Sequence, residues 1–149
     1  IYEGTNGIQA LDLVSRKILR DRGEELNKFI AEIRDTEIQD AKIANSMWSA
    51  LDALAAATEW ILEDSGEDPR IVLAGATPFL RALGLVTGGW LMAKAANLAA
   101  QGAEDDDFYK AKLATARFYA ANLLPQAAGY AQAATAGAED IMALPADAF

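Results

Sequence analysis

Residues 44–62 read ANSMWSALDALAAATEWIL, and this stretch decides the fold class. Apolar side chains recur in it every three or four residues, whereas the charged Asp52 and Glu59 fall off that stripe. Such a period is typical of an amphipathic α-helix with one buried face, so the stretch predicts a long helix. The stripe consists of Ala44, Met47, Trp48, Leu51, Leu54, Ala55, Thr58, Ile61 and Leu62.

Helical spacing continues toward the start of the chain. We expect a first helix that ends at about Asp21, before Gly23, and a second helix that runs from Glu24 to about Thr36. At the start of the first helix, Asn6 and Gln9 have the spacing of a capping box, and Thr5 is the alternative cap.

Two long helical segments are expected after the central helix. Residues 64–66 (Asp-Ser-Gly) end that helix, and Asp68-Pro69 supplies a cap and a first-turn proline for a segment over 69–102. A further segment begins in the acidic run 104–107 and continues to about Ala136.

Two prolines fall inside these segments. A proline within a helix removes a hydrogen bond and clashes with the preceding turn, so Pro78 and Pro125 should kink them. No strand pattern competes anywhere in the chain. We therefore expect an all-α protein, an antiparallel up-and-down helical bundle with about five helices, two of them long and Pro-kinked.

Three glycines, Gly84, Gly88 and Gly89, stand within six positions of the segment over 69–102. Each costs about 1 kcal/mol relative to alanine in a helix interior, so their presence indicates that another part of the structure approaches very closely. Contact with another helix is the favoured interpretation, and a ligand groove is the alternative.

The composition removes several classes of chemistry. The chain has no Cys and no His, which excludes disulfides, the usual structural zinc sites, Cys nucleophiles and His-based triads. Proton transfer would have to use Asp, Glu, Lys or Tyr. The acidic run 104–107 lacks the alternate spacing and the loop glycine of a calcium loop, so a role at a helix N-terminus is favoured over a metal site.

The charge distribution disfavours some partners. Residues 37–149 hold seven Lys/Arg against fifteen Asp/Glu, which argues against nucleic acid and against an anionic membrane surface. The uncharged stretches 82–93 and 118–138 are, respectively, too short and too weakly apolar to be integral membrane segments. No basic segment precedes an apolar one as in a secretory signal, so we expect a cytoplasmic location.

Two other groups of side chains have more than one interpretation. The tryptophans at 48, 60 and 90 could stack on a ligand, but their helical spacing favours the core or an interface. Arg16, Lys17, Arg20 and Arg22 could contact phosphates, but a solvated helix face is the favoured interpretation.

The chain opens with Ile1-Tyr2-Glu3-Gly4-Thr5-Asn6-Gly7. Glu3 precedes a turn of small residues that leads into a helix, where backbone amides can meet a ligand. From the residues alone, a solvated surface glutamate is the alternative. The first residue is not Met and nothing before Glu3 could form a pocket, so we expect a cut-out from a larger protein.

This opening, continued as Ile8-Gln9-Ala10-Leu11-Asp12-Leu13-Val14-Ser15-Arg16-Lys17, resembles the catalytic-glutamate segment of the acyl-CoA dehydrogenase family. The resemblance is close over residues 1–20. Residues 37–149 resemble, less specifically, the extra helical C-terminal domain of one bacterial branch of that family. There it rests on overall pattern, including the Asp68-Pro69 start and the Gly-Gly-Trp at 88–90.

The resemblance implies an oxidoreductase of fatty acid metabolism, a flavoprotein that uses FAD for α,β-dehydrogenation of an acyl-CoA thioester. It makes Glu3 the general base and places Gly4 against the substrate. It places Thr5, Asn6 and Gly7 near FAD, and it implies no metal. The family's N-terminal helical and central β-domains hold most FAD contacts, so no FAD is expected on these 149 residues alone.

The resemblance also divides the chain. Residues 1–36 would end the last helical domain, and residues 37–149 would form an appended helical-bundle domain. We expect the bundle to pack on the parent chain, or on a neighbouring subunit of a homo-oligomer, through the glycine-rich face at 84–89. The alternative is an acidic docking module for a pathway partner or an electron-transfer partner such as electron-transfer flavoprotein. A membrane-attaching extension is the least favoured option.

Overall fold

The computed structural model describes residues 4–64, 66, 68–102 and 106–148. Throughout these residues the regular structure is helical and contains no strand, which confirms the all-α prediction. In chain order the elements are α1 (Asn6–Asp12), the π-helix η1 (Leu13–Ile18), α2 (Glu24–Arg34), α3 (Ala41–Glu63), α4 (Arg70–Leu73), α5 (Ala76–Ala100), α6 (Asp107–Asn122), α7 (Gln126–Ala134) and the short 3₁₀ helix η2 (Ala146–Ala148).

The described residues form seven α-helices, not about five. The difference arises at the two prolines that were expected to kink long helices. Pro78 lies in the first turn of α5, and Pro125 is the N-cap of α7. A helix start needs no intrahelical partner for the missing proline amide. Each proline therefore stands at the beginning of a new helix and does not kink a continuous one.

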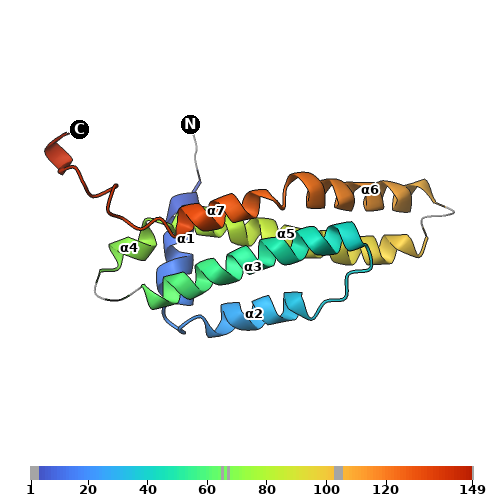
Figure 1. Ribbon diagram of the computed structural model, residues 1–149, viewed down its shortest axis with the longest axis horizontal. Coiled ribbons are helices and arrows are strands. Elements are labelled where there is room, and N and C mark those ends of the chain that lie inside the picture. Colours follow the sequence, from blue (N-terminus) through green and yellow to red (C-terminus); the bar gives the residue numbers. More distant parts are fainter. Residues whose placement is uncertain (1–3, 65, 67, 103–105, 149) are drawn as a thin grey trace.

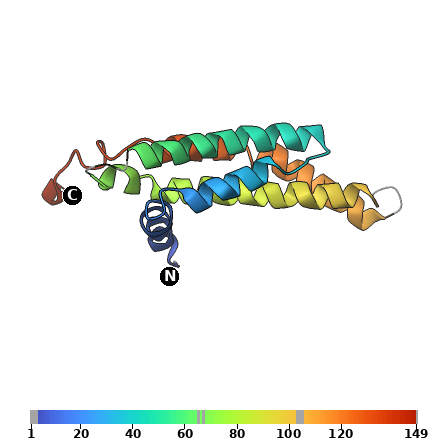
Figure 2. The same cartoon turned by 90° about the horizontal axis from the view of Figure 1, so that it is seen from below.

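The long helices lie lengthwise beside one another (Figure 1). α5 makes its most extensive contacts with α6 and α7 and also packs on α3. α3 and α5 run in opposite directions, and the chain returns along them through α6 and then α7 (Figure 1). α2 lies along one side, whereas α1 crosses one end near the start of α5 (Figure 2).

The stripe predicted on the central helix lies in the core. Met47, Leu51, Leu54 and Ile61 of α3 are fully buried. Thr58 is buried with them, and its hydroxyl donates to the Leu54 carbonyl at 2.9 Å, so its polar group is satisfied. Opposite α3 the core is mostly alanine, which lets the helix backbones approach closely. The buried alanines of α5, α6 and α7 are Ala76, Ala82, Ala93, Ala96, Ala99, Ala116, Ala120, Ala127, Ala131 and Ala134.

Asp40 joins the start of α3 to α6. Its carboxylate accepts hydrogen bonds from the Lys42 and Ile43 amides at 3.0 and 3.2 Å and from Arg117 Nε at 2.7 Å. Burial alone would raise the pKa of Asp40, but the bonds from Arg117 and the two amides outweigh burial and hold that pKa below 3.8, its ordinary value. The ionised form therefore stabilises the fold above that ordinary value, and its contribution is lost as pH falls through the lowered pKa.

The predicted close approach at the glycines of α5 is found at two of the three. A Cβ at Gly88 would overlap the Tyr119 hydroxyl, and a Cβ at Gly89 would lie 2.5 Å from Leu124 Cδ2. A Cβ at Gly84 would meet nothing within 4 Å. The helix-contact interpretation is therefore correct. The expectation that a parent enzyme or neighbouring subunit binds this face is wrong at Gly88 and Gly89, because side chains of the same chain already occupy them.

Replacing Gly84 and Gly88 separately with alanine should have opposite effects. Gly84→Ala adds a methyl group in open space within a helix and should stabilise the chain by about 0.5–1 kcal/mol. Gly88→Ala forces a methyl group into Tyr119 and should destabilise it by about 1–3 kcal/mol. Urea unfolding measures both effects. The loss from Gly88→Ala should shrink in a Tyr119→Phe background, and equal effects at the two glycines would contradict this packing.

Candidate functional site

The site predicted from the sequence lies at the start of α1, where Gly4 and Thr5 precede the helix and Asn6 and Gly7 are its first two residues. Glu3 lies outside the described residues. Gly4, Thr5, Asn6 and Gly7, the predicted substrate and FAD contacts, are all exposed. A Cβ at Gly4 or Gly7 would meet no atom within 4 Å, so both glycines border open space. The described part of this turn is therefore accessible to a ligand or to another domain.

The helix start differs from the predicted capping box. Thr5 is the N-cap of α1, and its carbonyl accepts a hydrogen bond from the Gln9 amide at 2.7 Å. Asn6 is already the first helical residue, so the prediction of an Asn6–Gln9 capping box is wrong by one position. Thr5, the alternative, caps through its backbone only, because its side chain makes no capping hydrogen bond.

α1 continues directly into the π-helix η1, a wider helical turn that is often found at functional sites. After it, the Gly23 amide donates to the Ile18 carbonyl at 2.8 Å, and positive φ angles at Arg22 (57°) and Gly23 (77°) turn the chain into α2. Ala10 and Val14 are fully buried, and α1 packs against α5. The exposed turn is thus followed by a helical segment that the rest of the fold holds in place.

The basic side chains of this region face solvent. Arg16, Lys17, Arg20 and Arg22 are exposed, and Arg16 pairs with Asp12 at 3.1 Å. An exposed i,i+4 pair on a helix contributes only about 0.3–0.5 kcal/mol. These residues form the solvated face that the sequence favoured over a phosphate site.

The acidic run before α6 acts as a helix cap where it can be followed. Residues 104 and 105 lie outside the described part of the chain. The Asp106 carboxylate accepts a hydrogen bond from the Phe108 amide at 2.7 Å, and Asp107 pairs with Lys110 at 2.9 Å. The capping interpretation is therefore confirmed for Asp106. No three His, Cys, Asp or Glu side chains among the described residues form a group that could hold a metal ion.

Trp90 joins α2 to α5. Its Nε1 donates to Thr36 Oγ1 at 2.8 Å, and Phe29 of α2 meets its ring edge-on with the centroids 5.5 Å apart. Lys94 Nζ lies 4.4 Å from the centroid of the Trp90 ring, within the range of a cation–π interaction. These contacts leave Trp90 only 8% exposed. The core interpretation holds for this tryptophan, and the joint that it forms was not predicted.

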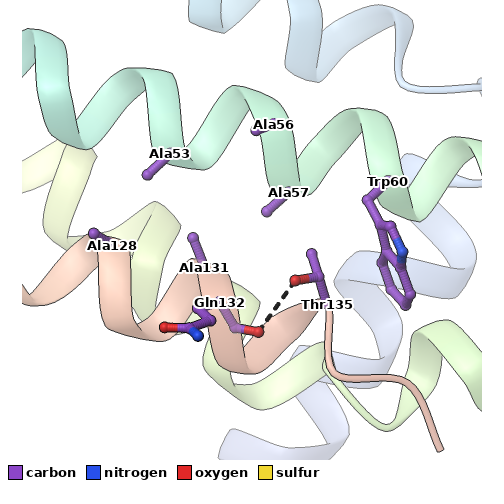
Figure 3. A pocket seen from close by; sticks show the side chains of 8 residues that line it. All are labelled: Ala53, Ala56, Ala57, Trp60, Ala128, Ala131, Gln132 and Thr135. Carbon is purple, nitrogen blue, oxygen red and sulfur yellow. Dashed lines mark hydrogen bonds between the residues drawn. The ribbon is translucent and has the colours of Figure 1, made fainter.

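The sequence reasoning also missed a groove between α3 and α7, shown in Figure 3. Its volume is about 340 Å³, and no titratable side chain lines it. The groove can therefore receive apolar surface but cannot perform acid–base chemistry. Alanines three and four residues apart on both helices were the available sequence signal. The lining residues are Ala53, Ala56, Ala57, Trp60, Ala128, Ala131, Gln132 and Thr135.

Together these features show that the described residues form an all-α helical domain. An exposed turn precedes a helical scaffold whose tryptophan joint, caps and alanine core are structural. None of the described helices has both the length and the apolar character that a membrane span needs. The described residues thus form a helical scaffold, and the predicted base, Glu3, lies ahead of them.

Comparison with known proteins makes this assignment specific. A family described as "Acetyl-CoA dehydrogenase C-terminal like" matches residues 24–145, and the chain belongs to this family. It is 39% identical to 3-methylmercaptopropionyl-CoA dehydrogenase of Ruegeria pomeroyi, over 83% of this chain and 23% of that protein. It is 34% identical to a butyryl-CoA dehydrogenase of Syntrophomonas wolfei, over 100% of this chain and 26% of that protein.

A third relative also matches this chain over only part of its own length. The broad-specificity linear acyl-CoA dehydrogenase of Mycobacterium tuberculosis is 30% identical over 100% of this chain and 27% of its own length. The resemblance to the acyl-CoA dehydrogenases is therefore confirmed. The chain spans about a quarter of the length of these curated relatives.

Removing the acceptor of the Trp90 hydrogen bond should weaken the contact between α5 and the residues that follow α2. Thr36→Val leaves the largely buried indole N–H unpaired and should destabilise the chain by about 1–3 kcal/mol. Urea unfolding followed by tryptophan fluorescence measures this loss. Thr115→Val is the matched control, because the Thr115 hydroxyl bonds only to the Ala111 carbonyl of its own helix. Equal losses in the two variants would contradict the role assigned to Thr36.

Proposed function

We propose that this chain is the C-terminal part of an FAD-dependent acyl-CoA dehydrogenase and that Glu3 is the general base. The observation that carries the proposal is the family match over residues 24–145, together with the resemblance of residues 1–20 to the catalytic-glutamate segment. The proposed enzyme oxidises an acyl-CoA thioester between its α and β carbons. It is a cytoplasmic homo-oligomer that passes electrons to an acceptor such as electron-transfer flavoprotein.

The residues at the start of α1 fit a contact with a flavin only in part. Gly4 and Gly7 border open space, and the Thr5 side chain is exposed and makes no cap hydrogen bond. These features suit one edge of a bound cofactor or substrate. The grooves found among the described residues lie elsewhere, on the helices. Most of an FAD site would therefore come from the remaining length of the enzyme.

The proposed chemistry explains why a carboxylate is required at position 3. The α-proton of a free thioester is only weakly acidic, so the site must polarise the carbonyl and raise the pKa of the base by removing water. The Glu3 carboxylate would accept this proton, and the Glu3 amide would donate to the thioester oxygen. FAD, when bound, supplies the acceptor for the β-hydride. Gly4 has no side chain, which would let the substrate lie against the backbone.

The helices after the turn would position this base. α1 and η1 bury Ala10, Val14 and Ile18 in the core, and α1 packs across α5. A turn that leads directly into such an anchored segment has a restricted direction. This arrangement supports a role for the bundle in holding the end of the catalytic segment.

We also propose the functional division of the chain at residues 36 and 37. Residues 1–36 would end the catalytic helical domain, and residues 37–149 would be the appended up-and-down bundle, which serves packing or oligomerisation. The family match begins at residue 24. Phe29 of α2 packs on Trp90 of α5, and the Thr36–Trp90 hydrogen bond ties the residues just after α2 to the same side chain. α2 would therefore be the joint that both parts share.

A second candidate function is docking of an electron-transfer or pathway partner. The groove in Figure 3 offers apolar surface, and α7 has no charged residue at all. α3 carries one basic residue, Lys42, against three acids, Asp52, Glu59 and Glu63. A field of this sign would attract a basic partner.

Replacing Glu3 with glutamine in the full-length enzyme tests the first proposal. Glu3→Gln keeps the size of the side chain but removes the base, so kcat should fall by roughly 10²–10⁴-fold while flavin stays bound. Glu32→Gln, on the exposed surface of α2, is the matched control and should be unchanged. Steady-state turnover and the flavin absorbance of the purified protein are the measurements. Normal turnover in Glu3→Gln would refute the assignment of Glu3 as the general base. A full-length protein that binds no flavin would refute the proposal that it is an FAD-dependent dehydrogenase.

Salt dependence tests the docking candidate. Binding of the full-length enzyme to electron-transfer flavoprotein should weaken as ionic strength rises, and Glu59→Lys with Glu63→Lys should weaken it at low salt. The single change Glu59→Lys should weaken binding more than Glu32→Lys, which makes the same charge change on the exposed surface of α2. Surface plasmon resonance at two salt concentrations gives the comparison. If binding changes neither with salt nor with these substitutions, docking through α3 and the adjoining groove is ruled out.

A further inference from the structure

The outer face of α5 is apolar and uncovered. Residues 82–93 carry no charge, and the opposite side of the helix is buried by its neighbours, with Ala82, Val86 and Ala93 fully buried. A helix that is apolar on all sides is normally covered on all sides. α5 instead leaves Leu91 52% exposed and Leu98 68% exposed.

These exposed leucines belong to one stripe. Gly84, Leu91 and Leu98 are spaced seven residues apart, so they follow one face of the helix. Gly84 is exposed and has open space around it. Two charged residues of α5 flank these positions, and both lie over aromatic rings. Arg81 Cζ is 5.6 Å from the centroid of the Tyr130 ring, and Lys94 Nζ is 4.4 Å from the centroid of the Trp90 ring. We call Gly84, Leu91 and Leu98 the outer face of α5.

The same helix already receives the segment that leads to the catalytic turn. α1 packs against α5 through a buried side that includes Ala10. Its other side leaves Ile8 68% exposed and Leu11 44% exposed. α1 and the outer face of α5 therefore both present apolar surface, and they belong to two helices in direct contact.

We propose that the outer face of α5 docks against the part of the same polypeptide that precedes Ile1, namely the earlier part of the helical domain that residues 1–36 would end. This inference rests on the proposed function. The related dehydrogenases are about four times as long as the matched part, so an occupant of sufficient size exists. The α1–α5 contact would be the first part of the same interface.

Covalent connection favours this occupant over a second copy. A domain joined to α1 is held next to α5, so its effective concentration there is of millimolar order. A second copy would have to bury the same two leucines without that advantage. Docking by the preceding domain would also fix the direction of the Gly4–Gly7 turn from two sides, through α1 and through α5.

Protection of introduced cysteines tests whether the face is covered. The 149-residue part contains no cysteine, so Leu91→Cys and Leu98→Cys each add one defined thiol there. In the full-length enzyme, maleimide labelling of each thiol, followed by peptide mass spectrometry, should be about tenfold or more slower than in the same variant unfolded in urea. Leu144→Cys, in the exposed C-terminal segment, is the control and should label at nearly the unfolded rate. Labelling of the Leu91→Cys and Leu98→Cys variants at the control rate would overturn the proposal.

A photo-crosslink identifies the occupant. Benzophenone-alanine placed at Leu91 of the full-length enzyme should give a product at the mass of a single chain, with the crosslink in a peptide from before Ile1. A product at twice that mass would show a second copy on the face and would overturn the proposal. Neither readout uses turnover or flavin. Loss of activity in Glu3→Gln and protection at Leu91 and Leu98 can therefore succeed or fail separately.

Discussion

Close approach of neighbouring elements to α5 is the constraint on which the rest of the structure depends. A Cβ at Gly75, just before this helix, would overlap the Ala134 carbonyl at the end of α7. Along the helix, Gly88 and Gly89 receive Tyr119 and Leu124. Small side chains give up apolar area, but they allow dense packing, and dispersion contacts accumulate with density. The positions of α3, α6 and α7 follow from how near each can come to this one helix.

Periodicity predicted the elements that pack through a single regular face. The apolar stripe of α3 was visible in the sequence because burial on one side imposes a repeat of three to four residues. The same reasoning failed at Pro78 and Pro125, since a proline inside an apolar run has the same local pattern whether it kinks a helix or begins one. Only the neighbouring contacts decide, and they involve Gly75 and Leu124, whose partners lie on other helices.

The candidate site was predictable in a different way. Glu3 and the turn after it were found by resemblance to a family, because one carboxylate beside small residues has no distinctive period of its own. The Trp90–Thr36 joint was missed because its two residues are 54 positions apart and neither repeats. The groove in Figure 3 was missed because alanines spaced along a helix do not indicate whether a neighbour covers that face or leaves it open. Contacts between distant residues carry most of what the sequence did not show.

The alanine core has a consequence for how this domain can change over evolutionary time. Alanine has no side-chain rotamers to lose, so ordering Ala93, Ala116 or Ala127 costs almost no side-chain entropy on folding. Its side chain is a single methyl group, whereas a larger buried residue must displace neighbouring side chains or backbone. Substitutions at these buried positions are therefore limited to residues about as small as alanine. Exposed positions carry no such limit, so the spacing between the helix axes constrains the core residues far more than the surface residues.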